Sequence, residues 1–263
     1  MSSSLLPENH RVIPFHNASS LFNEPAALRA AAAELGYLHM RGLLPESVLA
    51  PVRTFVCEAF ADLGWIHASG DNPQVWEAVA GAKLSGRGWD DRNWVEFQNC
   101  FSSHPDFLAL AESPHVMGIV EAIMGEPAWL ASVNFCWIKL PGSPEHTTLP
   151  HQDEWYLPHC RSMWTMWFPL VDTPFEVGPL AVVPGSHRGC VLEHENAFTG
   201  VRVESNVEWA SNEVLAGDVV FFAARTIHCA WSNVSATRAR VSADIRYEPQ
   251  SVGENSRLRN LQK

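Results

Sequence analysis

The second half of the chain consists of short apolar segments separated by turns rich in glycine and proline. The segments lie at 129–140, 163–171, 178–183, 213–215, 218–222, 228–231 and 238–247. Short strands with glycine and proline turns at close intervals are typical of a β-sandwich or barrel. Residues 127–248 are therefore predicted to form a β-sheet core.

The first half shows helical patterns instead. Residues 25–35 are rich in alanine and begin with a proline, and the stretch after Pro45 repeats apolar side chains at helical spacing. A short strand is expected at 37–42 and a further helix around 113–124, whereas 1–20 are expected to form an extended or loosely ordered lead-in. Helices followed by strands favour an α+β protein with a mainly β core and the helices packed on one face of the sheet.

No linker, internal repeat or low-complexity segment divides the chain, so residues 1–263 are expected to form a single domain. Its parts would be a helical front half (1–126), the strand region (127–248) and a C-terminal tail (249–263). Within the front half, residues 85–99 combine glycine, charge and tryptophan, and we expect them to form a long loop at the active site.

Composition argues against several classes of protein. Hydrophobic residues make up 46% of the chain, which allows a large core, but no apolar run is long enough for a membrane span and no secretion signal is visible. A net charge of −11 without a basic stripe disfavours a nucleic-acid partner. The six scattered cysteines form no Cys-x-x-Cys pair, which indicates neither a zinc site nor a disulfide framework and suits the cytoplasm.

The chemical signal around which the chain is organised is His151-Gln152-Asp153. On a strand, side chains alternate between faces, so His151 and Asp153 would point the same way and could bind one metal ion. A further histidine would complete the triad of two histidines and one carboxylate that binds non-haem iron(II) and leaves positions open. His228 is the candidate, because it follows the apolar strand 219–222 and opens another strand. An ordinary strand histidine bonded to a backbone carbonyl is the alternative.

The last predicted strand has one polar and one apolar face. The polar side chains are Arg238, Arg240, Ser242, Asp244 and Arg246, and the apolar ones are Ala239, Val241, Ala243, Ile245 and Tyr247. The apolar face can pack against the helices, so the polar face looks into water or into the barrel. A buried arginine is costly unless it binds an anion, and its planar fork matches a carboxylate. Arg240 with Ser242 would suit the distal carboxylate of 2-oxoglutarate; a solvent-facing strand with salt bridges is the alternative.

The order of these motifs resembles the phytanoyl-CoA dioxygenase family of iron(II)/2-oxoglutarate-dependent oxygenases. The matching pieces are His151-Gln152-Asp153, the stretch 164–187 ending in Pro-Gly-Ser-His, Gly217-Asp218 before a Phe-rich strand, His228, Asn233, Arg240 and Arg246-Tyr247. The resemblance implies a double-stranded β-helix (jelly roll) with His151, Asp153 and His228 as Fe(II) ligands.

The same resemblance implies a co-substrate arginine, with one irregularity. The family usually places it eleven residues after the second histidine, which is Ala239 in this chain. Arg240, with Ser242, is therefore the predicted anchor of 2-oxoglutarate and Arg238 the second candidate. The Pro-Gly-Ser-His turn is assigned a structural role, so His187 is not expected to bind the metal.

The resemblance implies an enzyme that uses Fe(II), 2-oxoglutarate and O2 to oxidise a small molecule, releasing succinate and CO2. Hydroxylation is the expected outcome; the carboxylate of Asp153 argues against halogenation, while desaturation, cyclisation and epoxidation stay open. Two other classes also stay open: a jelly-roll binding protein without catalysis, and a cupin that uses oxygen without 2-oxoglutarate.

Eleven tryptophans against three tyrosines suggest an aromatic pocket for an apolar or ring-containing metabolite, such as a secondary metabolite. The candidate substrate residues are Trp155, Tyr156, Trp167, Asn99, Trp89 and Trp94. Core packing is the alternative for each aromatic residue. The protein is expected to act as a monomer or homodimer.

Overall fold

The structure is a computed structural model and describes residues 11–67, 72–85, 89–194 and 200–252. Its α-helices are α1 (Pro25–Leu35), α2 (Glu46–Asp62), α3 (Arg92–Phe101), α4 (Pro105–Ala111), α5 (Pro114–Met124) and α6 (Asp153–Tyr156). The helices expected at 25–35, after Pro45 and around 113–124 are confirmed as α1, α2 and α5. The alanine-rich α1 has Pro25 in its first turn and ends at Gly36, whose φ of 73° is left-handed.

The strands form two sheets. They are β1 (Arg11–Ile13), β2 (Tyr37–Met40), β3 (Ala128–Leu130), β4 (Phe135–Lys139), β5 (Trp164–Pro169), β6 (Leu180–Val182), β7 (Glu208–Ala210), β8 (Val219–Ala223), β9 (His228–Ala230) and β10 (Arg240–Pro249). The smaller sheet has the order β1-β7-β6-β9. The larger has the order β2-β8-β5-β10-β3, and β4 also pairs with β10. The long β10 is thus hydrogen-bonded to three other strands.

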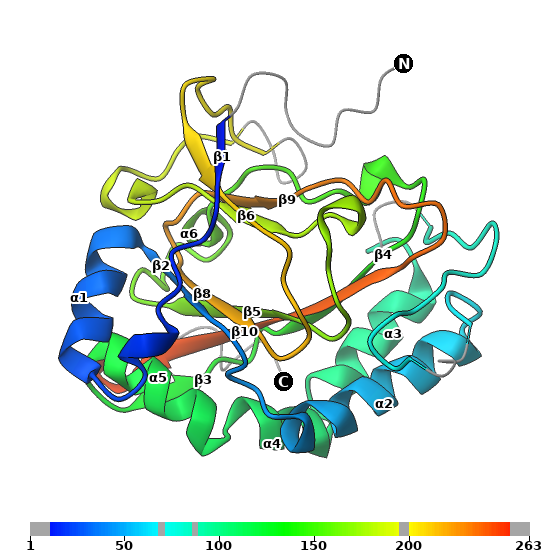
Figure 1. Cartoon of the computed structure of the whole chain (residues 1–263), viewed down its shortest axis with the longest axis horizontal. Coiled ribbons are helices and arrows are strands. Elements are labelled where there is room, and N and C mark those ends of the chain that lie inside the picture. The colour runs from blue at the N-terminus through cyan, green and yellow to red at the C-terminus, as the bar shows by residue number, and fades with distance from the viewer. Residues whose placement is uncertain (1–10, 68–71, 86–88, 195–199, 253–263) are drawn as a thin grey trace.

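The two faces of the larger sheet have different surroundings, as the alternation along β10 predicted. Val241, Ala243, Ile245 and Tyr247 belong to one large apolar core that includes side chains from α1 to α5. Figure 1 shows these helices along one side of the larger sheet and the smaller sheet on its other side. The polar residues of β10 therefore face the space between the sheets.

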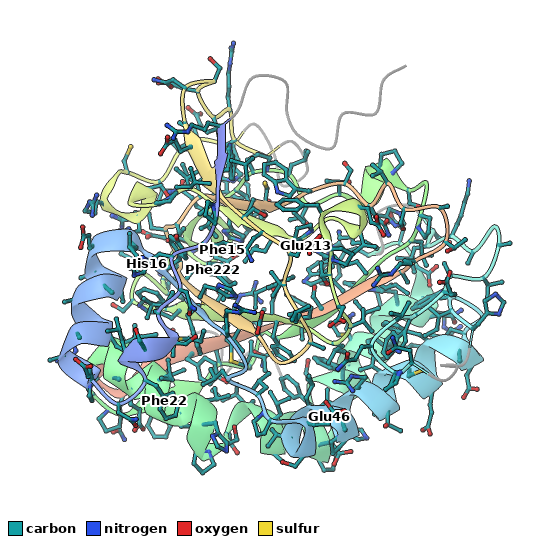
Figure 2. The ribbon with its side chains drawn as sticks, in the orientation of Figure 1. Phe15, His16, Phe22, Glu46, Glu213 and Phe222 are labelled. Carbon is teal, nitrogen blue, oxygen red and sulfur yellow. The ribbon has the colours of Figure 1, made fainter. Side chains whose placement is uncertain are left out.

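A second apolar cluster fills part of that space. It joins side chains of β2, β5 and β8 in the larger sheet to side chains of β6 and β7 in the smaller one, and Phe15 packs with them. Phe15 and Phe222, labelled in Figure 2, both belong to this cluster. Two sheets closed over a shared interior, with helices on one outer face, confirm the predicted α+β jelly roll.

The long loop predicted at 85–99 is wrong for its second part, which is helix α3; residues 86–88 lie outside the described residues. Two features specify this helix. The Asp91 side chain accepts a hydrogen bond from the Trp94 N–H (3.1 Å) and caps the N-terminus. Trp94, Phe97 and Phe101 then recur at helical spacing and are all buried.

The lead-in at 1–20, expected to be extended or loosely ordered, contains β1, which pairs in parallel with β7. Strand β7 itself was not predicted. The strand expected at 213–215 is only an isolated bridge between Val214 and Thr173.

In the described part of the chain, no single helix has the length and apolar character to cross a membrane. Helices α4 and α5 meet that criterion only when taken together, and they are bent by 45° relative to each other.

Candidate metal centre

His151 and Asp153 belong to different local structures. His151 forms an isolated bridge with His228, in which each residue donates its N–H to the carbonyl of the other (2.9 and 3.0 Å). Asp153 is instead the first residue of α6, so the expectation of one shared strand is wrong. Between them, the buried Gln152 side chain donates to the Arg225 carbonyl and accepts from the Leu192 N–H, which fixes this residue between the two candidate ligands.

His151, Asp153 and His228 nevertheless come together. Their potential ligand atoms all lie within 4.8 Å of one another, and within the described residues they are the one group of this kind. Asp153 Oδ1 lies 3.7 Å from His151 Nε2 and 3.8 Å from His228 Nε2. Metal bonds of about 2.1 Å hold two ligand atoms about 3 Å apart at a right angle and about 4.2 Å apart when opposite. The two separations from Asp153 Oδ1 fall within that range.

The hydrogen bonds of the two imidazoles leave the atoms that face Asp153 available. His151 Nδ1 lies 2.8 Å from the Leu149 carbonyl and His228 Nδ1 lies 2.9 Å from the Thr226 carbonyl. Because a carbonyl only accepts, each Nδ1 carries the proton and each Nε2 keeps a lone pair. This is the tautomer that a metal ligand requires.

The charge states also suit metal binding. Burial lowers the pKa of His228 to about 3, and the neighbouring His151 acts in the same direction, so His228 is neutral. Burial by itself raises the pKa of Asp153, but the Arg246 guanidinium and the two histidines outweigh it and hold the pKa well below its ordinary value. Two imidazoles and one carboxylate form the donor set of a non-haem iron(II) site.

A second polar group lies in the interior, toward the end of β10 that is far from Arg246. Arg240 and Ser242 are 2% and 0% exposed. Arg240 Nη1 donates to the Gly178 carbonyl (3.2 Å), while Arg240 Nε and Ser242 Oγ have no partner among the described residues. A buried donor without a partner costs free energy, so these atoms suit an anionic ligand.

Lys139, which the sequence reasoning missed, belongs to the same group. It is paired with Arg240 across β4 and β10, it is buried, and its Nζ donates to the His146 carbonyl. Burial, together with the charge of Arg240, lowers the pKa of Lys139 to about 7. The one sequence feature that could have identified Lys139 is that it is a charged residue at the end of an otherwise apolar strand.

Arg238 lies elsewhere than strand alternation suggested, because β10 begins only at Arg240. Its guanidinium donates to the Asp172 carbonyl (3.0 Å) and lies 3.6 Å from a carboxylate oxygen of Glu176. Its role as second candidate for the co-substrate anchor stays a prediction.

Aromatic side chains flank the metal centre on one side. Tyr156 meets the His151 ring edge-on, with centroids 5.6 Å apart, and is 41% exposed. Trp155 stacks on His194 at 4.4 Å. His194 was missed by the sequence reasoning; it is buried, its Nδ1 bonds to the Leu192 carbonyl, and its Nε2 has no partner in the described part of the chain. This edge of the site thus offers both aromatic surface and one hydrogen-bond acceptor.

The other candidate substrate residues lie in different settings. Trp167 is buried between the sheets, and Trp94 is buried against the helix-covered face. Trp89 is 49% exposed and packs edge-on against Trp94 and Phe135. Asn99 is exposed on α3.

Residues 33–241 match the family model of the phytanoyl-CoA dioxygenases. The chain belongs to the phytanoyl-CoA dioxygenase family. Among curated proteins, the 1-deoxypentalenic acid 11-beta-hydroxylase of Streptomyces exfoliatus is 26% identical, over 89% of this chain and 85% of the relative.

Two solved structures show the same fold as this phytanoyl-CoA dioxygenase family member. The epimerase SnoN, in complex with Fe3+, alpha ketoglutarate and nogalamycin RO, is 23% identical and has a TM-score of 0.61 over 86% of this chain and 85% of SnoN. EctD from S. alaskensis, with 2-oxoglutarate and 5-hydroxyectoine, is 18% identical and has a TM-score of 0.57 over 86% and 76% of the two chains.

Family membership confirms the enzyme class predicted from the sequence. The protein is a non-haem iron(II)/2-oxoglutarate-dependent dioxygenase, with O2 as the other co-substrate. The donor set formed by His151, Asp153 and His228 fits this class.

Proposed function

We propose that the protein hydroxylates a small apolar or ring-containing metabolite, with Fe(II) held by His151, Asp153 and His228. The observation that carries the proposal is the placement of the Nε2 atoms of His151 and His228 around Asp153 Oδ1, in an interior that also holds the buried Arg240 and Lys139. When bound, iron(II) and 2-oxoglutarate supply the activated oxygen that oxidises the substrate.

The residues of this chain have separate roles in the proposal. The two imidazoles and one Asp153 oxygen would hold the metal ion, and a set of three protein ligands would leave positions for the co-substrates. Arg240, Ser242 and Lys139 bind the distal carboxylate of 2-oxoglutarate, since their buried polar atoms match an anion. The two sheets keep bulk water away from this interior.

The substrate proposal rests on the aromatic edge of the site. Trp155 and Tyr156 present ring surface beside His151, and His194 Nε2 can accept a hydrogen bond from a substrate hydroxyl. The named substrate of the Streptomyces relative is 1-deoxypentalenic acid, and SnoN was solved with nogalamycin RO. A metabolite with an apolar body and few polar groups fits this edge of the site.

The reaction outcome is proposed by analogy with that hydroxylase. The names of two structural neighbours, an epimerase and a carbocyclase, show that other outcomes occur on this fold. These outcomes can be distinguished by mass spectrometry of the products formed from a metabolite panel that includes 1-deoxypentalenic acid. Hydroxylation adds one oxygen atom, whereas desaturation or cyclisation removes two hydrogens and epimerisation leaves the mass unchanged.

The co-substrate assignment has its own test, which needs no known substrate. Purified protein with Fe(II) is assayed for succinate formed from 2-oxoglutarate alone. Losing a buried hydrogen bond to a charged group costs about 1.5–3 kcal/mol, so R240M should raise the half-saturating 2-oxoglutarate concentration about 10- to 100-fold. R238M should leave it unchanged. The reverse pattern would assign the anchor to Arg238, and no change in either variant would refute the proposed anchor.

The same assay separates an enzyme from a jelly-roll protein that only binds ligands. The wild-type protein should retain iron after desalting and form succinate, and H228A should do neither.

We also propose that the protein works in the cytoplasm as a monomer or homodimer. Its six cysteines are all free, which suits a reducing compartment. Light scattering after size-exclusion chromatography measures the oligomeric state.

A further inference from the structure

The two oxygens of Asp153 have different neighbours. Oδ1 faces His151 Nε2 and His228 Nε2. Oδ2 accepts two hydrogen bonds from the larger sheet, one from Thr165 Oγ1 (2.8 Å) and one from Arg246 Nε (3.2 Å). Only Oδ1 is left for a metal.

Thr165 and Arg246 are placed for this contact by the sheet itself. They are register partners on β5 and β10, so their side chains stand next to each other on the inner face. Thr165 is 0% and Arg246 7% exposed. Both donors are therefore shielded from water that would compete for the carboxylate.

Arg246 has further contacts that hold its guanidinium in place. Its Nη1 donates to the Val133 carbonyl (3.1 Å), and its Cζ lies 5.3 Å from the centre of the Phe135 ring. Its backbone N–H donates to the Asn134 side chain (2.9 Å). Because the guanidinium is anchored at several points, it can orient Asp153 rather than follow it.

We propose that Thr165 and Arg246 are positioning residues, which occupy Asp153 Oδ2 so that the carboxylate binds the metal through Oδ1 alone. The inference rests on the proposed function. A carboxylate free to rotate could offer both oxygens to the ion and take up a position that 2-oxoglutarate or O2 needs. Thr165 and Arg246 thereby keep the site open while never touching the metal.

The test uses Co(II) as the probe, because its visible absorption depends on its coordination and it can be added to the metal-free protein without redox chemistry. The variants are T165V, which removes only the hydroxyl, T165S, which retains it, and R246K, which retains the charge but loses the fork. Two matched controls come from buried residues away from the centre. T173V removes the hydroxyl that donates to the Val171 carbonyl, and R53K alters the arginine that bonds to Glu46 and the Leu170 carbonyl.

Loss of a hydrogen bond to a ligating carboxylate typically weakens metal binding 10- to 100-fold. We expect T165V and R246K to bind Co(II) about 10-fold or more weakly and with an altered spectrum, and T165S, T173V and R53K to match the wild type. Circular dichroism melting of the metal-free proteins shows whether a variant is folded; should T165V not be, R246K and T165S decide the outcome.

Wild-type Co(II) affinity and spectrum in both T165V and R246K would overturn this inference, provided that D153A binds no Co(II). The proposed metal site would stand in that case. If the wild-type protein itself binds no Co(II), or D153A still does, the proposed metal site fails and the inference fails with it.

Discussion

Lys139 and Arg240 lie side by side in the interior, where burial disfavours the charged form of each. Burial and Arg240 bring the pKa of Lys139 to about 7, and burial lowers the pKa of Arg240 to about 10. A bound dicarboxylate would favour the protonated form of Lys139. Co-substrate binding should therefore include proton uptake whenever the pH is above about 7.

This linkage predicts a pH dependence. Below about pH 7 Lys139 is already protonated in the free protein, so the affinity for 2-oxoglutarate should change little. As the pH rises above about 7, the affinity should fall by up to about tenfold per unit. Calorimetric titration of the anaerobic Fe(II) protein at several pH values measures this. K139M should bind more weakly and lose the Lys139 component of the slope, and an identical slope in wild type and K139M would contradict the linkage.

Among individual residues, the sequence was sufficient to select those whose chemical type is informative by itself. His151, Asp153, His228 and Arg240 could be selected because a metal and an anion need those groups. Lys139 and His194 were missed, because their relevance depends on burial and on neighbours that are distant in sequence. The role of each remains a prediction.

The connection that leads into β6 depends on a single residue, Gly178. It has a φ of +80°, and a Cβ at this position would lie 2.1 Å from the Trp231 carbonyl oxygen. Its own carbonyl accepts the hydrogen bond from Arg240. We expect G178A to lower the free energy of unfolding by about 2 kcal/mol or more.

Gly118 provides the matched control. It is an exposed residue within α5, and an added Cβ would meet nothing within 4 Å. G118A should raise the free energy of unfolding by about 0.5–1 kcal/mol, because alanine is the better helix former. Urea denaturation measures both variants, and equal effects of the same sign would contradict the structure around Gly178.

Asp218 links the turn after β2 to the turn before β8. Its carboxylate accepts hydrogen bonds from the Gly42 and Leu215 N–H groups and lies 3.7 Å from His39 Nε2. Burial by itself raises the pKa of Asp218, but His39 and these N–H groups outweigh it, so the pKa lies below its ordinary value of 3.8.

A carboxyl group whose pKa is lowered by folding stabilises the protein above its unfolded-state pKa and loses that effect as the pH falls through the folded-state pKa. D218N should therefore destabilise the protein by about 1–2 kcal/mol at pH 7. The difference from wild type should shrink as the pH drops below 3.8. Unfolding measured at both ends of this range checks the prediction, and a difference independent of pH would argue against it.

Among the elements, those with a long periodic pattern were predicted, and so were the short strands β2, β6 and β9, whereas the short strands β1 and β7 were not. Helices α1 and α2 and strand β10 have patterns that continue over many residues. Strands β1 and β7 have three residues each, and their pairing joins residues about two hundred positions apart, which no local pattern reveals. Helix α3 was missed because the glycine, charge and tryptophan that precede it obscured its buried stripe.

For the molecule as a whole, the fold joins parts of the site that are far apart in sequence. The alternation along β10 predicted that its apolar face packs against the helices, and the structure confirms this. It left open whether the polar face looks into water or into the barrel, and in the structure Arg240, Ser242 and Arg246 are buried. Strand order and the bridge between His151 and His228 required the structure, since each depends on contacts between distant segments. The single domain over 1–263 remains a prediction.

Metal binding should stabilise the folded molecule, because the three proposed ligands come together only on folding. A ligand present at 1,000 times its Kd adds about 4 kcal/mol to the free energy of unfolding. The melting temperature should therefore rise on anaerobic addition of Fe(II) and rise again with 2-oxoglutarate. D153A should show neither rise. An unchanged melting temperature of the wild-type protein under saturating Fe(II) would argue against the site.

One strand carries both Arg246, beside the proposed metal ligand Asp153, and Arg240, the proposed anchor, six residues earlier. Hydrogen bonds to β4 and β5 on either side prevent β10 from sliding. The strand therefore fixes the distance between the proposed metal site and the proposed anchor, so the length of the oxo acid should determine whether it is used as co-substrate. 2-Oxoadipate is longer by one methylene, so the enzyme should form much less glutarate from it than succinate from 2-oxoglutarate. Equal use of both oxo acids would mean that the spacing along β10 does not select the co-substrate. If 2-oxoglutarate is preferred, selectivity among oxo acids is a property of the backbone as much as of any side chain.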